Sequence, residues 1–388
     1  MKKITSKLKF SALMKKKTPF YAWDLDVFHS RIHYILNAFS CIDNFRLFYA
    51  MKANPSPIIL QSLLDQEIGV DVCSVQELKL ALKVGIKPNR ISLCPFVPSV
   101  EELKFFSDSG CNIDLDSIED LKLWAKLKAG SRQIGLRVNP DVKAGFHSHC
   151  SSGLWSSKFG IPIDELQNAF EIARNKGLSI NGLHIHIGSS SYDPKPYIMA
   201  IEKIFRFITE QGLILSYINI GGGWGVPFSS QDEFETHEHF PLNEYAKSIS
   251  NLMDVYQISK TLEIRAEPGE YIVGPCGFLV CKVRRILFRT KNGKRHKIAV
   301  LDGGSYLYPG PSLYGSDNYI ILLNRDEHKK ELQILAGRSM LAGDIFGPER
   351  KLASLEPGDI IAIGVAGAYS QIKSTNFNLL PKAKGFSL

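Results

Sequence analysis

The sequence predicts an α/β protein: a (β/α)8 TIM-like barrel followed by a mostly antiparallel β domain. Two observations carry this prediction. Between residues 45 and 269, short β-rich runs alternate with longer helical stretches in eight strand-then-helix units of roughly 25–35 residues each. Beyond residue 271, β runs separated by glycines and charged turns follow one another without long helical patterns. The length of 388 residues suits one large domain and a smaller one.

Each expected barrel strand is rich in β-branched and aromatic residues and ends at a polar or glycine-containing segment. The expected strands cover residues 45–53, 68–74, 90–96, 111–117, 132–140, 178–190, 215–225 and 261–269. The helices expected between them cover residues 57–67, 75–85, 100–110, 118–130, 163–177, 196–212 and 242–256. A repeating parallel strand and helix of this kind closes into a barrel.

The domain boundaries follow from the change of texture. Residues 1–26 form an N-terminal segment that contributes a strand, within KTPFYAWDLD (17–26), to the β domain. Residues 27–270 form the barrel, and residues 271–388 form the C-terminal β domain. The strands expected in this last domain cover residues 277–290, 296–304, 318–324, 331–337 and 358–367.

Composition excludes several classes of protein. The apolar run of the basic N-terminus is interrupted too early for a signal peptide, and no segment approaches the ~20 apolar residues of a membrane-spanning helix, so we expect a cytoplasmic protein. The net charge of +8 comes partly from the first seventeen residues, which we interpret as a solvated tail; attraction to an anionic substrate or an acidic carrier protein is the alternative. No basic helix with interleaved aromatics indicates nucleic-acid binding. Seven cysteines without a CxxC pair indicate reduced thiols rather than a zinc site: Cys41, Cys73, Cys94, Cys111, Cys150, Cys276 and Cys281.

Polar residues fall repeatedly at the carboxyl ends of the expected strands, where barrel enzymes place their chemistry. Lys52 follows FYAM at the end of the first strand. A lysine among apolar residues is desolvated, which lowers its pKa and favours Schiff-base chemistry, whereas a surface lysine in a loop is the plainer interpretation of that position alone. Asp71 and Ser74 end the second strand, and Arg137 and Asn139 end the fifth.

The run HIHIGSS (184–190) alternates like a strand, with His184 and His186 on one face. Two histidines at this spacing could bind a metal, but no acidic partner of a metal-site type follows. We therefore expect no metal site.

Two further motifs end strands. GGGWG (221–225) follows the strand YINI, and glycines there let the backbone approach a phosphate closely, although a tight turn alone would also explain them. The spacing differs from the GxGxxG of dinucleotide-binding proteins. EPGE (267–270) ends the last strand and places Glu267 at the carboxyl end of the barrel.

In combination and in order, these motifs resemble one family, the pyridoxal-phosphate decarboxylases with the alanine-racemase-like fold, which act on diaminopimelate, ornithine and arginine. The resemblance runs from about Thr18 to Asn378. It rests on TPFYAWDLD, YAMKAN around Lys52, DVCSVQEL, LRVNP, SKFG, HIHIGSS, INIGGGWG, EPGE, the LY of Leu313–Tyr314, the GD of Gly343–Asp344, EPGD, GAY and NFN. The combination is specific for fold and cofactor and less specific for the substrate.

The resemblance implies roles for the cofactor half of the site. Lys52 would hold pyridoxal 5′-phosphate as a Schiff base, and His186 would stack on its ring. Glu267 would pair with the pyridine nitrogen and sustain a quinonoid intermediate, which favours decarboxylation, because racemases of this fold carry an arginine there. The remaining residues that we expect around the cofactor are Asp71, Arg137, Ser189, Gly221, Gly222, Gly223, Gly269 and Tyr369.

The substrate half departs from the family. Relatives carry a cysteine four residues before the aspartate that matches Asp344, supplied by the partner subunit and thought to reprotonate the carbon after CO2 loss; here that residue is Met340, and a thioether has no proton to give. The next residue, an acid in many relatives, is Leu341. The arginine of the usual EPGR is Glu270, and a second arginine upstream of the LY motif aligns with Gly310. These arginines bind the distal carboxylate of diaminopimelate, so the sequence disfavours that substrate.

The sequence therefore predicts a PLP-dependent carboxy-lyase acting on an amino acid or an amino-acid conjugate, free or bound to a carrier protein, and not on diaminopimelate. The residues expected to meet the substrate are Glu270, Tyr314, Met340, Leu341 and Tyr369. Alternatives are a racemase, a lyase, a decarboxylation-coupled transaminase, or a non-catalytic cofactor-binding paralogue. The family builds each site from two chains, so a homodimer with shared active sites is expected.

Overall fold

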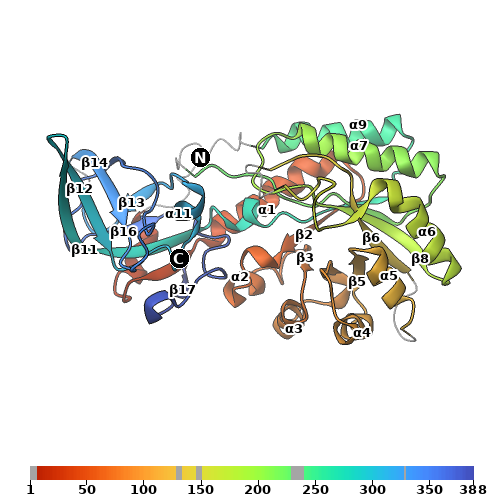
Figure 1. Ribbon diagram of the computed structural model, residues 1–388, viewed down its shortest axis with the longest axis horizontal. Coiled ribbons are helices and arrows are strands. Elements are labelled where there is room, and N and C mark those ends of the chain that lie inside the picture. The colour runs from red at the N-terminus through yellow and green to blue at the C-terminus, as the bar shows by residue number, and fades with distance from the viewer. Residues whose placement is uncertain (1–6, 128–132, 146–150, 229–239, 327–328) are drawn as a thin grey trace. The chain divides into compact units, whose positions relative to one another are not determined.

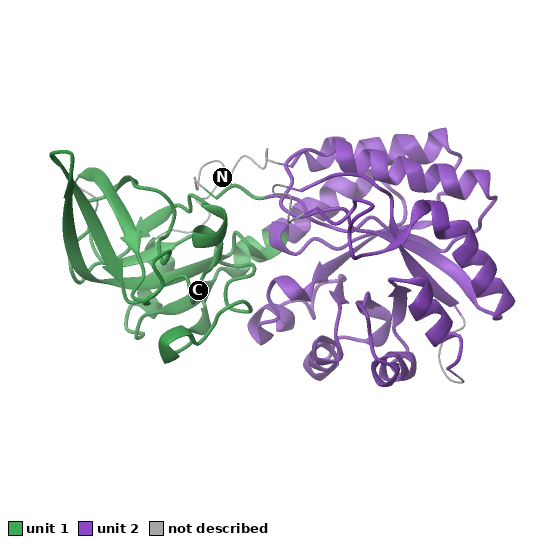
Figure 2. Cartoon of the chain, in the orientation of Figure 1, with its two compact units in different colours: residues 1–30, 226–238, 272–388 green, residues 31–225, 239–271 purple. Residues whose placement is uncertain are grey.

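The computed structural model describes residues 7–127, 133–145, 151–228, 240–326 and 329–388, and the chain forms two compact units (Figures 1 and 2). Unit 1 comprises residues 1–30, 226–238 and 272–388, and unit 2 comprises residues 31–225 and 239–271. Of the cysteines, Cys150 lies outside the described residues, and the other six are free thiols. No helix in the described part of the chain is long and apolar enough to cross a membrane.

Unit 2 contains the predicted barrel. Its strands are β2 (Phe45–Ala50), β3 (Gly69–Val72), β4 (Ile91–Leu93), β5 (Asn112–Leu115), β6 (Gln133–Asn139), β8 (Ser179–Ile185), β9 (Tyr217–Asn219) and β10 (Glu263–Ala266). They pair in parallel in the order β5-β4-β3-β2-β10-β9-β8-β6, and a further pairing of β5 with β6 closes the ring. A short strand, β7 (Ile161–Pro162), pairs with the carboxyl end of β6. The (β/α)8 barrel is confirmed.

Helices alternate with these strands, as Figure 1 shows. They are α2 (Pro57–Gln61), α3 (Val75–Val84), α4 (Val100–Asp108), α5 (Ile118–Trp124), α6 (Leu166–Asn175), α7 (Lys195–Glu210), α9 (Leu242–Val255) and the short α10 (Glu270–Val273), preceded by α1 (Leu25–Ala38). Serine caps fix several of their starts, because a serine side chain can accept from the free amide groups of the first turn. Ser74 accepts from the Glu77 amide, and Ser99 forms a capping box with Glu102. Ser74 thus has a structural role.

Unit 1 contains the mostly antiparallel β domain, which is confirmed. Its strands are β1 (Phe20–Trp23), β11 (Gly277–Lys291), β12 (Lys294–Leu301), β13 (Ile320–Leu322), β14 (Lys330–Ala336), β15 (Arg350–Ala353), β16 (Ile360–Ile363) and β17 (Lys384–Ser387), with a short helix α11 (Gly310–Tyr314). The sheet order is β13-β16-β11-β12-β14-β15. β1 pairs antiparallel with β11, and the parallel pairings are β12 with β14 and β1 with β17.

The N-terminal segment is more ordered than the expected solvated tail. Residues Lys7–Leu13 form a 3-10 helix whose Phe10 and Leu13 are buried in the core of unit 1. The Phe10 ring packs edge-on against Phe278 with 5.2 Å between ring centroids, and Lys9 pairs with the buried Asp24. Apolar burial therefore fixes Phe10 and Leu13, while Lys15, Lys16 and Lys17 remain exposed to solvent.

Candidate active site

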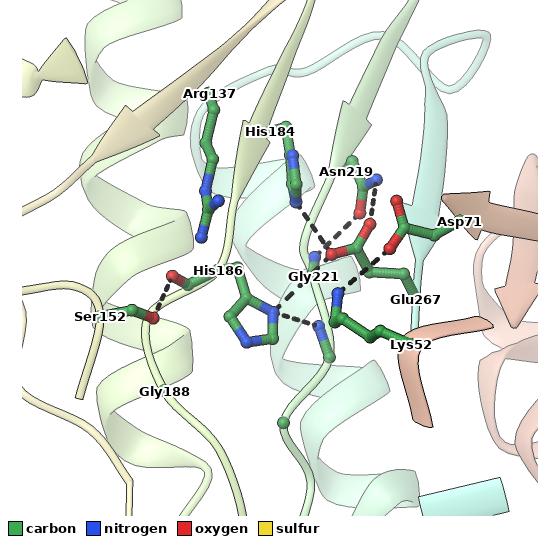
Figure 3. A network of polar contacts seen from close by, with 12 residues as sticks. Lys52, Asp71, Arg137, Ser152, His184, His186, Gly188, Asn219, Gly221 and Glu267 are labelled. Atoms are coloured by element: carbon green, nitrogen blue, oxygen red, sulfur yellow. Dashed lines mark hydrogen bonds and ion pairs between the residues drawn. The ribbon is translucent and has the colours of Figure 1, made fainter. Parts of the chain in front are cut away.

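Glu267 is the centre of a network of buried polar side chains at the carboxyl ends of the barrel strands (Figure 3). It follows β10 directly and is 2% exposed. Its Oε1 lies 3.1 Å from His184 Nε2, and its Oε2 accepts from Asn219 Nδ2 at 3.0 Å. His184 and Asn219 belong to β8 and β9, so two neighbouring strands fix both oxygens of the carboxylate.

Lys52 lies in a 3-10 turn, Met51–Ala53, that directly follows β2. The strand ends at Ala50, earlier than predicted, because the chain turns there and packs against the segment that carries Glu267. The Ala50 amide donates to Pro268 O, and a Cβ on Gly269 would lie 2.8 Å from the Ala53 Cβ. Close backbone packing at Gly269 thus brings the Lys52 turn beside Glu267.

Asp71, the third residue of β3, holds the lysine amine. Lys52 Nζ donates to Asp71 Oδ2 at 3.1 Å, and the side chain of Lys52 is 38% exposed while that of Asp71 is 1% exposed. Asp71 Oδ1 is buried and has no hydrogen-bond partner among the described residues. Asp71 therefore anchors the amine of a lysine whose side chain is partly exposed.

His186 is the first residue after β8, and its side chain is 15% exposed. Ser152 donates to its carbonyl at 2.8 Å, and the Gly222 amide lies 3.4 Å from its Nδ1. Burial, together with the positive charges of Lys52 and Arg137, lowers the pKa of His186 from 6.5 to about 3. The ring is therefore neutral near pH 7.

The two carboxyl groups near Lys52, those of Glu267 and Asp71, differ in pKa. Burial raises the pKa of Glu267, but the charge and hydrogen bond of His184 and the charge of Lys52 outweigh burial and hold that pKa below its ordinary value. Burial and the negative charge of Glu267 raise the pKa of Asp71 to about 7, against the opposing effect of Lys52. Glu267 is thus the firmly ionised carboxylate of the site.

The glycine run fills the space between the ends of β8 and β10. A Cβ on Gly222 would lie 2.5 Å from Glu267 O, and one on Gly223, whose φ is +91°, would lie 1.8 Å from Gly188 O. The Gly221 amide donates to Asn219 Oδ1 at 2.9 Å. These glycines are therefore required by close backbone packing, whatever further role their amides have.

The remaining barrel residues predicted for the site lie on the same strand ends. Arg137, on β6, donates to Asp116 Oδ1 at 3.0 Å, and its guanidinium lies 4.6 Å from the centre of the Phe159 ring. Ser189 is half-buried, three residues after His186. Glu270 begins α10 and accepts a hydrogen bond from the Ser190 hydroxyl.

Four predicted site residues belong to unit 1. Met340 and Leu341 are 84% and 51% exposed, and the Met340 amide donates to Asn378 Oδ1 at 2.8 Å. Tyr314, at the end of α11, is 49% exposed. Tyr369 has a φ of +55°, and Lys373 Nζ lies 4.8 Å from the centre of its ring.

Two residues of the network were missed by the sequence reasoning. His184 was considered only as a metal ligand, and Asn219 was not considered at all. The signals were present: alternation places His184 on the face of His186, and Asn219 is a polar residue inside the apolar run YINI before the glycines. Among the described residues, no group of three or more His, Cys, Asp or Glu side chains is arranged to hold a metal.

The site fits the predicted pyridoxal phosphate. The amine of Lys52 can bind an aldehyde, and the ionised Glu267 can keep a pyridine nitrogen protonated. The neutral ring of His186 offers a flat face, and the buried Asp71 Oδ1 lacks a partner among the described residues, as an atom awaiting a ligand would. The residues present are therefore those that this cofactor needs.

Comparison with known proteins agrees with this geometry. Residues 25–274 match the family model described as pyridoxal-dependent decarboxylase, pyridoxal binding domain. Diaminopimelate decarboxylase of Methanothermobacter thermautotrophicus is 32% identical in an alignment of 376 residues that covers 94% of this chain and 85% of that protein. The crystal structure of diaminopimelate decarboxylase from Helicobacter pylori, complexed with L-lysine, is 31% identical with a TM-score of 0.86, covering 97% of this chain and 93% of that one. Lysine/ornithine decarboxylase of Vibrio vulnificus, at 22% identity, shares the fold with a TM-score of 0.82 over 98% and 97% of the two chains.

Proposed function

The chain belongs to the family of pyridoxal-dependent decarboxylases, and we propose that Lys52, Glu267 and His186 are its catalytic residues, acting on an amino acid other than diaminopimelate. The chain is a PLP-dependent carboxy-lyase that acts on amino acids. The observation that supports the catalytic assignment is the ionised Glu267, held by His184 and Asn219 beside the amine of Lys52.

When bound, pyridoxal phosphate supplies a protonated ring that takes up the electron pair left when a carboxylate departs as CO2. Lys52 Nζ would hold its aldehyde carbon and release it to the amine of the substrate. Glu267 would hold a proton at the ring nitrogen, where an arginine would not. This favours decarboxylation over racemisation.

The other proposed cofactor contacts follow from position. The neutral ring of His186 would lie against the pyridine ring, and Asp71 would orient the lysine amine. Burial at these strand ends would exclude water from the reacting atoms. The residues that we propose around the rest of the cofactor are Arg137, Ser189, Gly221, Gly222, Gly223, Gly269 and Tyr369.

Return of a proton to the substrate carbon needs a donor other than Met340, because a thioether carries no proton. His186 is a poor donor, since its lowered pKa, about 3, leaves the ring neutral near pH 7. The donors left to test are Lys52, Tyr369 and water. Met340→Cys restores the proton donor of the family and so tests its absence directly. If Met340 causes misdirected protonation, this variant suppresses formation of pyridoxamine phosphate during turnover.

The substrate proposal rests on Glu270. Its carboxylate, held by Ser190, stands three residues after Glu267, where the family resemblance implies an arginine that binds a distal carboxylate. A negative charge in that place would repel such a group, and Gly310 would supply no attraction in the second arginine position. Tyr314, Leu341 and Tyr369 would contribute the rest of the substrate contacts. A carrier-bound amino acid fits this proposal as well as a free one.

Diaminopimelate is the second candidate, because curated relatives at about 30% identity carry that name. The two candidates are separated by measuring CO2 release from diaminopimelate, lysine, ornithine, arginine and neutral and acidic amino acids. We expect release from at least one amino acid and none from diaminopimelate. Turnover of diaminopimelate with the highest kcat/KM of the panel would refute the substrate proposal.

The cofactor assignment has its own test. Borohydride reduction of the cofactor-loaded protein, followed by peptide mapping, should mark the peptide that contains Lys52. Lys79, on α3, is the matched control lysine and should stay unmodified. A loaded protein with Lys52 unmodified would contradict the assignment.

A further inference from the structure

His184 lies between two carboxyl groups in the interior of the barrel. Its Nε2 is 3.1 Å from Glu267 Oε1, and its Nδ1 is 3.7 Å from Asp114 Oδ2. All three side chains are at most 2% exposed. They come from three strands, β8, β5 and the end of β10, so the arrangement belongs to the barrel and not to a loop.

The proton count of the imidazole follows from this placement. A neutral imidazole has one N–H and one lone pair, so one of two ionised carboxylates would face a lone pair in a buried place. Burial raises the pKa of Asp114, whereas His184, the Tyr217 hydrogen bond and Arg265 act in the opposite direction and favour its ionised form. An imidazolium presents an N–H to each. Apart from the Cys94 thiol, a weak donor and acceptor that also hydrogen-bonds His184, no other group among the described residues is placed to satisfy His184 Nδ1 or Asp114 Oδ2.

Asp114 is itself held from the far side. The Tyr217 hydroxyl donates to its Oδ1, and the Arg265 guanidinium lies 3.6 Å from the centre of the Tyr217 ring. Two glycines make room for this pair: a Cβ on Gly135 would lie 1.9 Å from Asp114 Oδ1, and one on Gly182 would lie 2.1 Å from the Tyr217 ring. The barrel interior is thus shaped around a chain of contacts that runs from Arg265 to Glu267.

The other charged groups near His184 and Glu267 come from every strand packed against them. Negative or acidic groups are Asp71 on β3, Asp114 on β5 and the Cys94 thiol after β4. Positive groups are Lys52 after β2 and Arg137 on β6, with the neutral His186 after β8. Although burial opposes the charge on His184, the Glu267 carboxylate and the Cys94 thiol raise the pKa of His184 well above 6.5.

We infer that His184 is a positioning residue, a permanently buried imidazolium that Asp114 and Tyr217 hold beneath Glu267 so that Glu267 stays ionised toward the ring nitrogen of the cofactor. This inference rests on the proposed function only for the group that Glu267 faces. The charge on His184 is a property of the cofactor-free chain.

Histidine-selective ¹⁵N labelling and NMR of the cofactor-free full chain test the charge. Both ring nitrogens of His184 should carry protons at pH 7.5 and show no titration between pH 6 and pH 8. His33, exposed on α1, serves as the reference histidine for the labelling. His184→Gln assigns the signal; if that variant does not fold, Glu267→Gln assigns it by the shift it causes. A neutral His184 tautomer at pH 7.5 would overturn the inference.

A double-mutant cycle in the cofactor-free chain tests the coupling. His184→Gln leaves Glu267 buried without its cationic partner, and Glu267→Gln leaves His184 buried without its anionic partner. The double variant should therefore lose less stability than the sum of the losses in the two single variants. Additive effects of the two changes on the urea midpoint would overturn the inference. His33→Gln is the matched control and should leave the midpoint unchanged.

In the loaded enzyme, His184→Gln should change the pH profile rather than substrate binding. Loss of an adjacent positive charge raises a carboxyl pKa by about 1–3 units, so the acid limb of the kcat profile should move upward by that amount with KM little changed. An unmoved acid limb would contradict the positioning role. If the proposed function fails, the wild type releases no CO2 from any amino acid, whereas the NMR and stability results on the cofactor-free chain keep their meaning.

Discussion

A carboxyl group that is 2% exposed ordinarily binds a proton, because burial disfavours the charged form. Glu267 departs from this rule, since His184 and Asn219 occupy both its oxygens and Lys52 adds a positive charge nearby. The charge of one residue thus depends on side chains from two other strands. We propose that this single charge favours decarboxylation over racemisation.

Replacement of that charge gives the first prediction. Glu267→Gln keeps the shape of the side chain but removes the negative charge proposed to keep the ring nitrogen protonated, so kcat for CO2 release should fall by about 10²–10³-fold. The cofactor absorbance should remain, because Lys52 still holds the cofactor. The exposed Glu119, replaced by glutamine, is the matched control. Unchanged kcat in Glu267→Gln would contradict the role.

His186 gives a prediction of pH dependence. Its pKa is about 3 in the folded chain and near 6.5 when unfolded, so the unfolded chain binds more protons between these values and stability is lost as pH falls through that window. The pKa of Asp71 is raised to about 7 in the folded chain, so Asp71 stabilises the fold as pH falls from 7 to 4. Because the two effects oppose each other, the contribution of His186 is measured by comparing a His186 variant with the wild type. In urea unfolding of the cofactor-free chain, His186→Phe should lose less stability than the wild type from pH 6.5 to pH 4.5. Equal slopes for His186→Phe and the wild type would contradict the prediction.

Residue types at strand ends indicate Lys52, Asp71, His186 and Glu267 as candidates, and only the family resemblance gives them roles. His184 and Asn219 were not selected, since they act on Glu267 and not on a ligand, and a sequence does not show which side chains face each other across a barrel. Their common partner, Glu267, lies 83 residues from His184 and 48 residues from Asn219 along the chain.

At the scale of elements, the site depends on how closely the strand ends approach one another. Gly222 has no unusual φ, so its need for glycine is purely steric: a Cβ would lie 2.5 Å from Glu267 O. Any side chain there pushes the end of β9 away from the end of β10. The positions of Glu267 and His186 would both change as a result.

Gly222→Ala should therefore lower the free energy of unfolding by about 1–3 kcal/mol, as overpacking does elsewhere, and weaken cofactor binding. Gly343→Ala is the matched control, because a Cβ there meets nothing within 4 Å. Urea unfolding and a cofactor titration measure both effects. Equal stability of the two variants would show that the strand ends can separate without cost.

The existence of the barrel elements was predictable, and their ends were not. The strand expected to reach residue 53 ends at Ala50, because its last residues turn to pack on the segment after β10. α1 was missed although Phe28, Ile32 and Ile35 follow a helical spacing. The sequence of β17, KGFS, has no alternating pattern that would predict a strand. The strand is defined by its parallel pairing with β1.

At the scale of the whole molecule, the change from helical to β texture near residue 271 was enough to predict two kinds of architecture in one chain. The sequence could not show that the first 30 residues group with the C-terminal β unit as a whole, since that depends on strand pairing and on the burial of Phe10 and Leu13. It did indicate, through TPFYAWDLD, that one strand comes from that segment.

We propose a homodimer, and unit 1 offers a surface for it. Large apolar side chains are exposed on loops that are joined by hydrogen bonds from Met340 to Asn378 and from Ser312 to Ile345. This apolar cluster consists of Leu313, Met340, Leu341, Ile345 and Leu379. Exposed apolar groups gathered in this way are typical of protein interfaces.

Light scattering should give a mass of twice 43.4 kDa for the wild type. Leu379→Glu places a charge in the apolar cluster, where the side chain is 90% exposed, and should shift the protein toward the monomer and lower CO2 release. Leu8→Glu, which changes a side chain that is 82% exposed elsewhere in unit 1, is the control. A dimer unaffected by Leu379→Glu would place the interface elsewhere.

The most direct test of the central claim is the release of labelled CO2 from carboxyl-labelled amino acids by the cofactor-loaded enzyme, with Lys52→Ala measured beside the wild type. We predict release from at least one amino acid by the wild type and none above background by Lys52→Ala. Absence of release from every amino acid, by an enzyme shown to carry the cofactor on Lys52, would contradict the claim.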